Sequence, residues 1–261
     1  MFYEKYLKAA KEKSSIININ LDPALPKQRK ENTIPEKYVT KEDTQTLLNF
    51  SLDIIEQVSD YCCSIKPNTQ YYLGHTDILK QIAKKTHKEG MLAILDHKLS
   101  DIGSTNGSAI YWIKEMGFDA FTFSPFAGNT QKTVEKAHQN NLGIIVLTIM
   151  SNQEAENMMI NTTVNNQPYY LHTAQTVKET QADGCVVGLT CFVKDTYIKN
   201  IQNIVGNKTI FLLQGIGPQG GQVNKIRHVA NPLVSLGRTV IYSKNPQETI
   251  KKHNEILKKY T

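Results

Sequence analysis

Short apolar runs rich in β-branched residues alternate along the chain with longer amphipathic stretches. This rhythm predicts repeated βα units built around a parallel sheet. Eight strands are expected, at residues 16–21, 62–66, 91–96, 120–123, 143–148, 184–189, 209–213 and 233–236. Helices are expected between and after them, at residues 44–59, 76–89, 105–116, 130–140, 169–180, 194–205, 221–228 and 246–258.

Eight βα units in a chain of 261 residues match the size of a (β/α)8 TIM barrel. A doubly wound open sheet is the alternative, but its first βα turn usually carries the GxGxxG fingerprint. Here the first expected strand ends in Leu21-Asp22-Pro23 instead. We therefore predict an α/β fold with one barrel domain over residues 1–261, preceded by an N-terminal helix.

A long polar stretch, residues 152–167, follows the fifth expected strand and is rich in Asn, Thr and Glu. Loops of this length inside a compact barrel are commonly active-site lids. The position of the stretch at the catalytic end of the barrel favours a lid, and a tolerated surface insertion is the alternative.

Charge and composition narrow the class of partner. Lys and Arg number 30 against 24 Asp and Glu, so the net charge of +6 favours anionic partners. The basic runs at 27–30 and 251–252 are short and lack interleaved aromatic residues, which is typical of solvated surface and not of a nucleic-acid site. No apolar run is long enough to span a membrane and no signal core opens the chain, so we expect a cytoplasmic protein without a membrane partner.

The four cysteines, Cys62, Cys63, Cys185 and Cys191, lie in apolar, strand-like surroundings. Their spacing matches neither a disulfide framework nor a CxxC metal site. They are expected to be reduced thiols in the core. The histidines also lack metal-ligand spacing, and no metal site is predicted.

Charged residues gather where the first three expected strands end. Strand alternation places Asp96 and Lys98 on one face of the third strand and His97 on the other. Asp22 and Lys66 end the first and second strands at the same rim. An unpaired buried charge costs several kcal/mol, so these groups must be paired, solvated or bound to a ligand. A rim network of salt bridges without catalytic function is the alternative.

Two segments near the C-terminus are suited to binding phosphate. The glycine-rich run from Gly215 to Gly221 follows the seventh strand, and Arg238 follows the eighth. Loops at these two places are the usual phosphate site of such barrels. Glycines allow close approach of the backbone, the amide of Gln219 can donate, and Arg238 offers a bidentate fork. The alternative is a glycine-rich turn beside a surface arginine.

The motif Asp96-x-Lys98-x-x-Asp101-Ile102 resembles the signature of orotidine 5'-phosphate decarboxylases. Six further segments resemble this family in order and spacing, and several look closest to its longer, type 2-like subgroup: Asn20 to Pro23, Ile65 to Asn68, Ser124 to Gly128, Leu147 to Asn152, Gly215 to Gly221 and Gly237 to Tyr242. Gln214 and Pro218 depart from the family, where Pro and Ala are common, and both are expected to adjust the conformation of the loop.

The resemblance implies a (β/α)8 barrel that converts orotidine 5'-monophosphate to uridine 5'-monophosphate (UMP) and CO2, the last step of UMP biosynthesis, without a cofactor or metal. It implies that Lys98 delivers a proton to carbon 6 of the pyrimidine and that Asp96 lies near the departing carboxylate. Lys66 would bridge the ribose and the charged groups, and Asp22 would hold a ribose hydroxyl.

The same resemblance implies that Ser151 links the lid to the base and that Gln219, Gly237 and Arg238 surround the phosphate. Asp101 and Thr105 would reach into the neighbouring subunit's site, which implies a homodimer. The alternatives for Asp101 and Ser151 are helix-capping or loop positions.

Three other functions are alternatives to this one. Sugar-phosphate relatives, such as hexulose-phosphate synthases and keto-gulonate-phosphate decarboxylases, hold Mg²⁺ through an acidic residue at the end of the second strand. Here Lys66 stands at that end, and a cation repels Mg²⁺. A nucleotide-binding barrel without turnover is disfavoured by the intact Asp96, Lys98 and Asp101, and a nucleic-acid binder by the absence of any motif.

Overall fold

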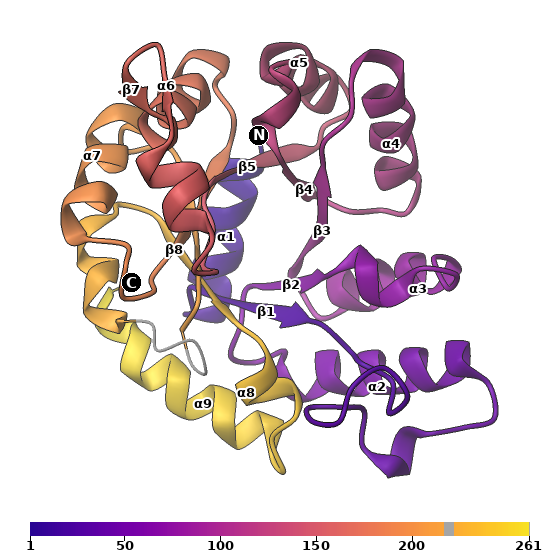
Figure 1. Cartoon of the computed structure of the whole chain (residues 1–261). Helices are drawn as coiled ribbons and strands as arrows, with labels where there is room; N and C mark the ends of the chain where they lie inside the picture. Colours follow the sequence, from indigo (N-terminus) through magenta and orange to yellow (C-terminus); the bar gives the residue numbers. More distant parts are fainter. Residues whose placement is uncertain (217–221, 261) are drawn as a thin grey trace.

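The computed structural model describes residues 1–216 and 222–260 and shows a closed barrel of eight parallel strands (Figure 1). Its strands run in the order β1-β10-β9-β8-β5-β4-β3-β2, which confirms the predicted (β/α)8 barrel over the open sheet. Each predicted strand overlaps an observed one: β1 (Ile17–Leu21), β2 (Ser64–Pro67), β3 (Leu92–Leu99), β4 (Ala120–Phe123), β5 (Gly143–Ile149), β8 (Gly184–Gly188), β9 (Ile210–Gln214) and β10 (Pro232–Leu236).

Helices surround the strands, because the outward strand side chains and the apolar helix faces form one large core. The predicted segment 221–228 is a 3₁₀ helix over Val223–His228, and Gly221 lies outside the described residues. No helix in the described ranges is long and apolar enough to cross a membrane. The helices are α1 (Phe2–Lys13), α2 (Asp43–Val58), α3 (Asp77–Lys88), α4 (Gly103–Glu115), α5 (Thr130–Gln139), α6 (Tyr169–Thr180), α7 (Asp195–Val205), α8 (Arg238–Ile241) and α9 (Pro246–Leu257).

Helix α1 closes the N-terminal end of the barrel, and Figure 1 shows it near the centre of the ring of helices. Its buried residues Phe2 and Tyr6 join a cluster of inward-facing strand residues. The Tyr6 hydroxyl donates to the Pro232 carbonyl at 2.7 Å, and Lys5 forms an ion pair with Asp119 at 2.8 Å. With this end filled, the described part of the barrel opens toward the C-terminal ends of its strands.

The polar stretch 152–167 contains more regular structure than its composition suggests. A π-helix spans Glu156–Asn161, and β6 (Thr163–Val164) pairs antiparallel with β7 (Gln167–Pro168). The stretch is attached to the end of β5 by a contact in which the Met150 N–H points to the Met159 sulfur at 3.3 Å. Most of its side chains remain exposed to solvent.

The prediction that all four cysteines lie in the core is wrong for Cys191. Cys62, Cys63 and Cys185 are buried, whereas Cys191 is exposed, and all four are free thiols. Strand β8 ends at Gly188, so Cys191 lies in the turn that leads to α7 and not in a strand.

Gly143 makes room for helix α1 at the start of β5. A Cβ added there would lie 2.4 Å from Cγ and 2.7 Å from Cβ of Phe2, close to the α1 backbone. We therefore expect Gly143→Ala to destabilise the fold by about 1–3 kcal/mol through overpacking. Urea unfolding measures this change.

Gly107 supplies the control for this substitution. It lies within α4, where a Cβ would meet only Lys136 Cε at 4.0 Å. Gly107→Ala should stabilise the protein by about 0.4–1 kcal/mol because it restricts the unfolded chain. Equal stability of Gly143→Ala and the wild type would contradict the packing described for α1.

Candidate active site

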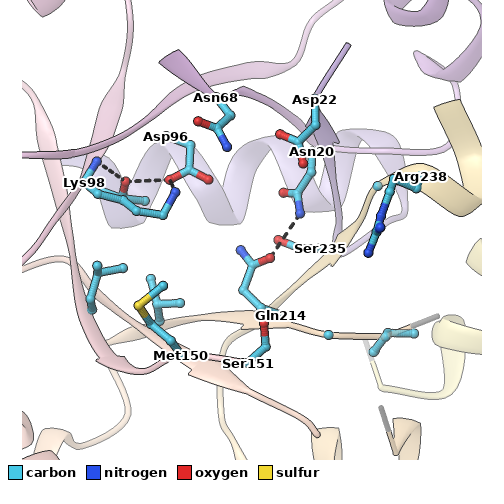
Figure 2. Close-up of a pocket in the computed structure, with 16 residues that line it drawn as sticks. Asn20, Asp22, Asn68, Asp96, Lys98, Met150, Ser151, Gln214, Ser235 and Arg238 are labelled. Atoms are coloured by element: carbon cyan, nitrogen blue, oxygen red, sulfur yellow. Dashed lines mark hydrogen bonds and ion pairs between the residues drawn. The ribbon is translucent and has the colours of Figure 1, made fainter. Parts of the chain in front are cut away.

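A cavity of about 220 Å³ lies at the C-terminal end of the barrel (Figure 2). Residues within or just after all eight barrel strands line it. The cavity contains most of the predicted site residues, and its two ends differ in chemistry. Lys98 and Asp96 stand at one end and Arg238 at the other, as Figure 2 shows.

The Asp96 carboxylate is held between two ammonium groups. Lys66 donates to Oδ2 of Asp96, and Lys98 donates to Oδ1 at 2.8 Å. The Thr122 hydroxyl also donates to Oδ1, at 2.9 Å. Lys66 is 1% exposed, whereas the side chain of Lys98 is 36% exposed and lines the cavity. Three of the predicted charges, Lys66, Asp96 and Lys98, therefore form one array in which Lys98 lines the cavity.

A kink in β3 turns Lys98 toward the cavity. Strand β3 runs to Leu99, three residues beyond its predicted end, and its pairing with β4 shifts register between Leu95 and Leu99. Within this bulge Lys98 has φ 51°, and its backbone N–H donates to Thr122 Oγ1 at 2.9 Å. A non-glycine residue in this left-handed region stores about 1–3 kcal/mol of strain, which the surrounding contacts must offset.

His97 points away from the cavity, as strand alternation predicts. Its Nδ1 lies 3.1 Å from the Thr69 hydroxyl, which itself donates to the Asp96 carbonyl oxygen at 3.0 Å. His97 therefore packs on the helix side of β3 and helps to fix the backbone at Asp96.

The pKa values of the two carboxyl groups in the cavity are shifted in opposite directions. Burial alone raises the pKa of Asp96, but attraction to Lys66 and Lys98 and hydrogen bonds from both hold that pKa well below its usual range. Asp96 is therefore an anion at neutral pH. Burial also raises the pKa of Asp22, and attraction to Lys66 only partly opposes this shift. Among the described residues, Oδ1 of Asp22 is buried without a hydrogen-bond partner, which suits it to accept a donor from a ligand.

Tyr242 holds the backbone that carries Asp22. Its hydroxyl donates to the Asp22 carbonyl and accepts from the Ala24 N–H, both at 2.8 Å. The guanidinium of Arg29 packs over the Tyr242 ring and donates to the same hydroxyl at 3.2 Å. Tyr242 is also the C-cap residue of α8, the short helix that begins at Arg238. Tyr242 thus connects the Asp22 loop to the short helix that carries Arg238.

The predicted phosphate end is present in part. Gly215, Gly237 and Arg238 line the cavity, and Gly215 has φ 93°, a conformation that favours glycine. A Cβ at Gly237 would lie 3.3 Å from Cβ of Asn20, so this glycine leaves space for that side chain. Gln219 and its neighbours over 217–221 lie outside the described residues.

Ser151 lines the cavity beside Met150, but Asp101 and Thr105 do not. Both lie on the exposed surface at the start of α4. Asp101 Oδ1 accepts the N–H of Ile102 at 2.7 Å, and no side chain caps α4 at its N-terminus. The cavity of one chain therefore lacks both residues. The alternative, in which Asp101 caps α4, is wrong, because its side chain makes no capping hydrogen bond to that helix.

Sequence reasoning missed several polar residues of the cavity. Asn20 lies two positions before Asp22, and Asn68 two positions after Lys66, so strand alternation could have placed both on the inner face. The expectation that Gln214 only adjusts the loop is incomplete, because its carboxamide lines the cavity and accepts from Asn20. In the described part of the chain, no three His, Cys, Asp or Glu side chains cluster as a metal site would require.

We expect Tyr242→Phe to destabilise the protein by about 1–3 kcal/mol, because the Ala24 N–H and the Asp22 carbonyl would lose their partner. Chemical denaturation measures the loss. Tyr71→Phe is the matched control, since the Tyr71 hydroxyl accepts a single 3.3 Å hydrogen bond, from Arg29, among the described residues. If Tyr242→Phe loses no more stability than Tyr71→Phe, the Tyr242 hydroxyl does not hold the backbone of the Asp22 loop.

Comparisons with known proteins identify the family of this chain. A family model described as "Orotidine 5'-phosphate decarboxylase / HUMPS family" matches residues 43–253. The orotidine 5'-phosphate decarboxylase of Herpetosiphon aurantiacus is 29% identical over 254 residues, which cover 93% of this chain and 90% of the relative. That of Methanocaldococcus jannaschii is 31% identical over 214 residues, covering 80% and 93% of the two chains.

Solved structures share the fold. The OMP decarboxylase of Leishmania donovani superposes with a TM-score of 0.80 at 18% identity, covering 99% of this chain and 98% of the other. The orotidine 5'-monophosphate decarboxylase of Plasmodium berghei gives a TM-score of 0.80 at 17% identity and covers 100% and 98% of the two chains. The extent of the family match, together with the relative at 31% identity, establishes that this chain belongs to the orotidine 5'-phosphate decarboxylase / HUMPS family.

Proposed function

We propose that this protein decarboxylates orotidine 5'-monophosphate to UMP and CO2, the final step of UMP biosynthesis. The observation that carries the proposal is the ammonium of Lys98, held by Asp96 at one end of a cavity whose other end presents Arg238. A nucleotide matches this arrangement, because its base would lie beside Lys98 and its phosphate beside Arg238. Membership of the decarboxylase family supports the same reaction.

The chemical difficulty of the reaction is the carbanion that remains at carbon 6. Its electron pair lies in the plane of the ring and cannot be delocalised into the ring carbonyls. When the bond between carbon 6 and the carboxylate breaks, the pair stays on carbon 6 and CO2 leaves. In our proposal the ammonium of Lys98 stabilises this pair and then transfers a proton to it, and Lys98 regains a proton from solvent.

Repulsion between Asp96 and the substrate carboxylate is a secondary contribution. Two unit charges at about 4 Å interact with roughly 4 kcal/mol at an effective dielectric constant of about 20. Enzymes typically lower barriers by about 8–23 kcal/mol. Most of the reduction must therefore come from the preorganised ammonium of Lys98, which needs no reorganisation at the moment of reaction.

Asp22 and Lys66 complete the reacting end. We assign the buried, unpartnered Oδ1 of Asp22 to a ribose hydroxyl, which would supply the missing donor. Lys66 is buried against Asp96 and supplies the second positive charge that keeps this carboxylate ionised. Its ammonium at the end of β2 also disfavours Mg²⁺ there, which supports a metal-free reaction.

The remote phosphate would bind Arg238, Gly237 and Gln219. Binding at this end can drive a closure that strengthens the charges at the other end by expelling water. The stretch 152–167 is suited to act as the lid, because it begins directly after Ser151, which lines the cavity, and is attached at Met150.

A homodimer would bring Asp101 and Thr105 to the partner's site. Both residues are exposed at the start of α4, and the neighbouring Ile102 is 63% exposed, an apolar side chain that a partner surface would cover. In this arrangement each complete site combines Lys98 of one chain with Asp101 of the other.

Protein treated with EDTA should decarboxylate orotidine 5'-monophosphate, and Lys98→Ala should lower kcat by about 10⁴-fold or more. Loss of the proton donor costs about 10²–10⁴-fold, and loss of the preorganised charge costs a further factor of about 10²–10³. The fall in substrate absorbance and the release of CO2 measure the rate. UMP binding by the variant should remain measurable.

Lys84→Ala is the matched control, because Lys84 is exposed on α3. It should react as fast as the wild type. A wild-type protein that is inactive after EDTA treatment, or that turns over only after Mg²⁺ is added, would refute the metal-free reaction. Near-normal turnover by Lys98→Ala would remove Lys98 as the proton donor.

Mixing two inactive variants tests the shared site. Lys98→Ala and Asp101→Ala should each be inactive alone, and subunits exchanged between them should recover about a quarter of the wild-type activity. Half of randomly formed dimers are hybrids, and each hybrid keeps one of its two sites intact. If Asp101 acts within its own chain, every site in the mixture stays defective and no activity returns.

A further inference from the structure

A ladder of polar side chains crosses the barrel beneath the cavity. The Ser64 hydroxyl donates to Asn18 Oδ1 at 2.9 Å, and Asn18 Nδ2 donates to both Asn20 Oδ1 and Ser235 Oγ at 3.0 Å. Asn20 Nδ2 in turn donates to Gln214 Oε1 at 3.1 Å. The ladder therefore joins β2, β1, β10 and β9 and ends at the wall of the cavity.

This ladder fixes the orientation of the Gln214 carboxamide. Its oxygen accepts a hydrogen bond from Asn20, whose side chain occupies the space that Gly237 leaves by lacking a Cβ. The amide nitrogen, Nε2, consequently faces the cavity, and no partner for it exists among the described residues. In Figure 2 this nitrogen points into the open space between Lys98 and Arg238.

The position of Nε2 limits which substrate atom it can meet. Under the proposed function, carbon 6 of the pyrimidine faces Lys98 and the phosphate faces Arg238. Carbons 2 and 6 flank the ring nitrogen that carries the ribose, so the carbonyl at carbon 2 points away from Lys98 toward the middle of the cavity. A neutral carbonyl oxygen there is an acceptor suited to a neutral amide donor.

We propose that Gln214 is a substrate-binding residue whose Nε2–H donates to the carbonyl oxygen at carbon 2 of the pyrimidine, and that Asn20 is the residue that positions it. The inference rests on the proposed function. It adds a determinant of base specificity, because a base without an acceptor at this position leaves a desolvated amide unpaired.

UMP and three related ligands test the contact. Gln214→Met keeps the length of the side chain but removes the donor, and it should weaken UMP binding by roughly 2- to 12-fold, the cost of one neutral hydrogen bond. Binding of ribose 5-phosphate, which lacks the base, should not change. The wild type should prefer UMP over 2-thio-UMP, whose sulfur is a poorer acceptor, and Gln214→Met should lose that preference. The ratio of the affinities for UMP and 4-thio-UMP should be the same in Gln214→Met and the wild type.

A substitution of Asn20 and a second substitution of Gln214 test the same hydrogen bond independently. Asn20→Ala should weaken UMP binding in the wild type but not further in the Gln214→Met background, because both changes act on one hydrogen bond. Gln214→Glu keeps the shape and the acceptor for Asn20 while replacing the donor by an anion, so it should weaken UMP binding more than Gln214→Met. Gln131→Met, at an exposed position on α5, is the matched control and should bind all four ligands normally.

Three results would overturn the inference: unchanged UMP affinity in Gln214→Met, an equal loss of ribose 5-phosphate affinity, or an unchanged preference for UMP over 2-thio-UMP. If one of these results is obtained while the wild type still decarboxylates orotidine 5'-monophosphate, the proposed function stands and only the role of Gln214 is refuted. A wild type that neither turns over that substrate nor binds UMP would refute both.

Discussion

The structure depends on one buried carboxylate held between two ammonium groups. Asp96 is shielded from water, and a charge in that position costs several kcal/mol unless it is paired. Lys66 offsets the cost from within the barrel, and Lys98 offsets it from the cavity. Because Lys66 is buried while Lys98 is accessible, the array places a positive charge against any ligand without leaving Asp96 uncompensated.

Several other features of the fold maintain this arrangement. The kinked backbone at Lys98 is held by Thr122, the Asp22 loop by Tyr242, and the Asp96 carbonyl by Thr69. Helix α1 fills the opposite end of the barrel. The site is therefore built on strand ends that neighbouring strands fix, which suits a reaction whose barrier is lowered by charges already in place.

The sequence predicts the barrel because strand and helix patterns are local. Apolar β-branched runs and amphipathic stretches repeat eight times, and Asp22, Lys66, Asp96 and Lys98 fall at strand ends where a barrel brings them together. The contacts that local patterns could not predict join distant strands. Asn20 and Gln214 are 194 residues apart, and Tyr242 is 220 residues from Asp22, so each pair depends on the register of the closed barrel. The extension of β3 and the exposure of Cys191 depend on where pairing ends, which composition does not encode.

The central claim, that Lys98 stabilises and protonates a carbanion at carbon 6, can be tested without any loss of CO2. Exchange of the hydrogen at carbon 6 of UMP for deuterium passes through the same carbanion in reverse, and NMR in heavy water follows it. The account predicts that the wild-type protein promotes this exchange and that Lys98→Ala does not, although both bind UMP. Exchange by Lys98→Ala at the wild-type rate would contradict it.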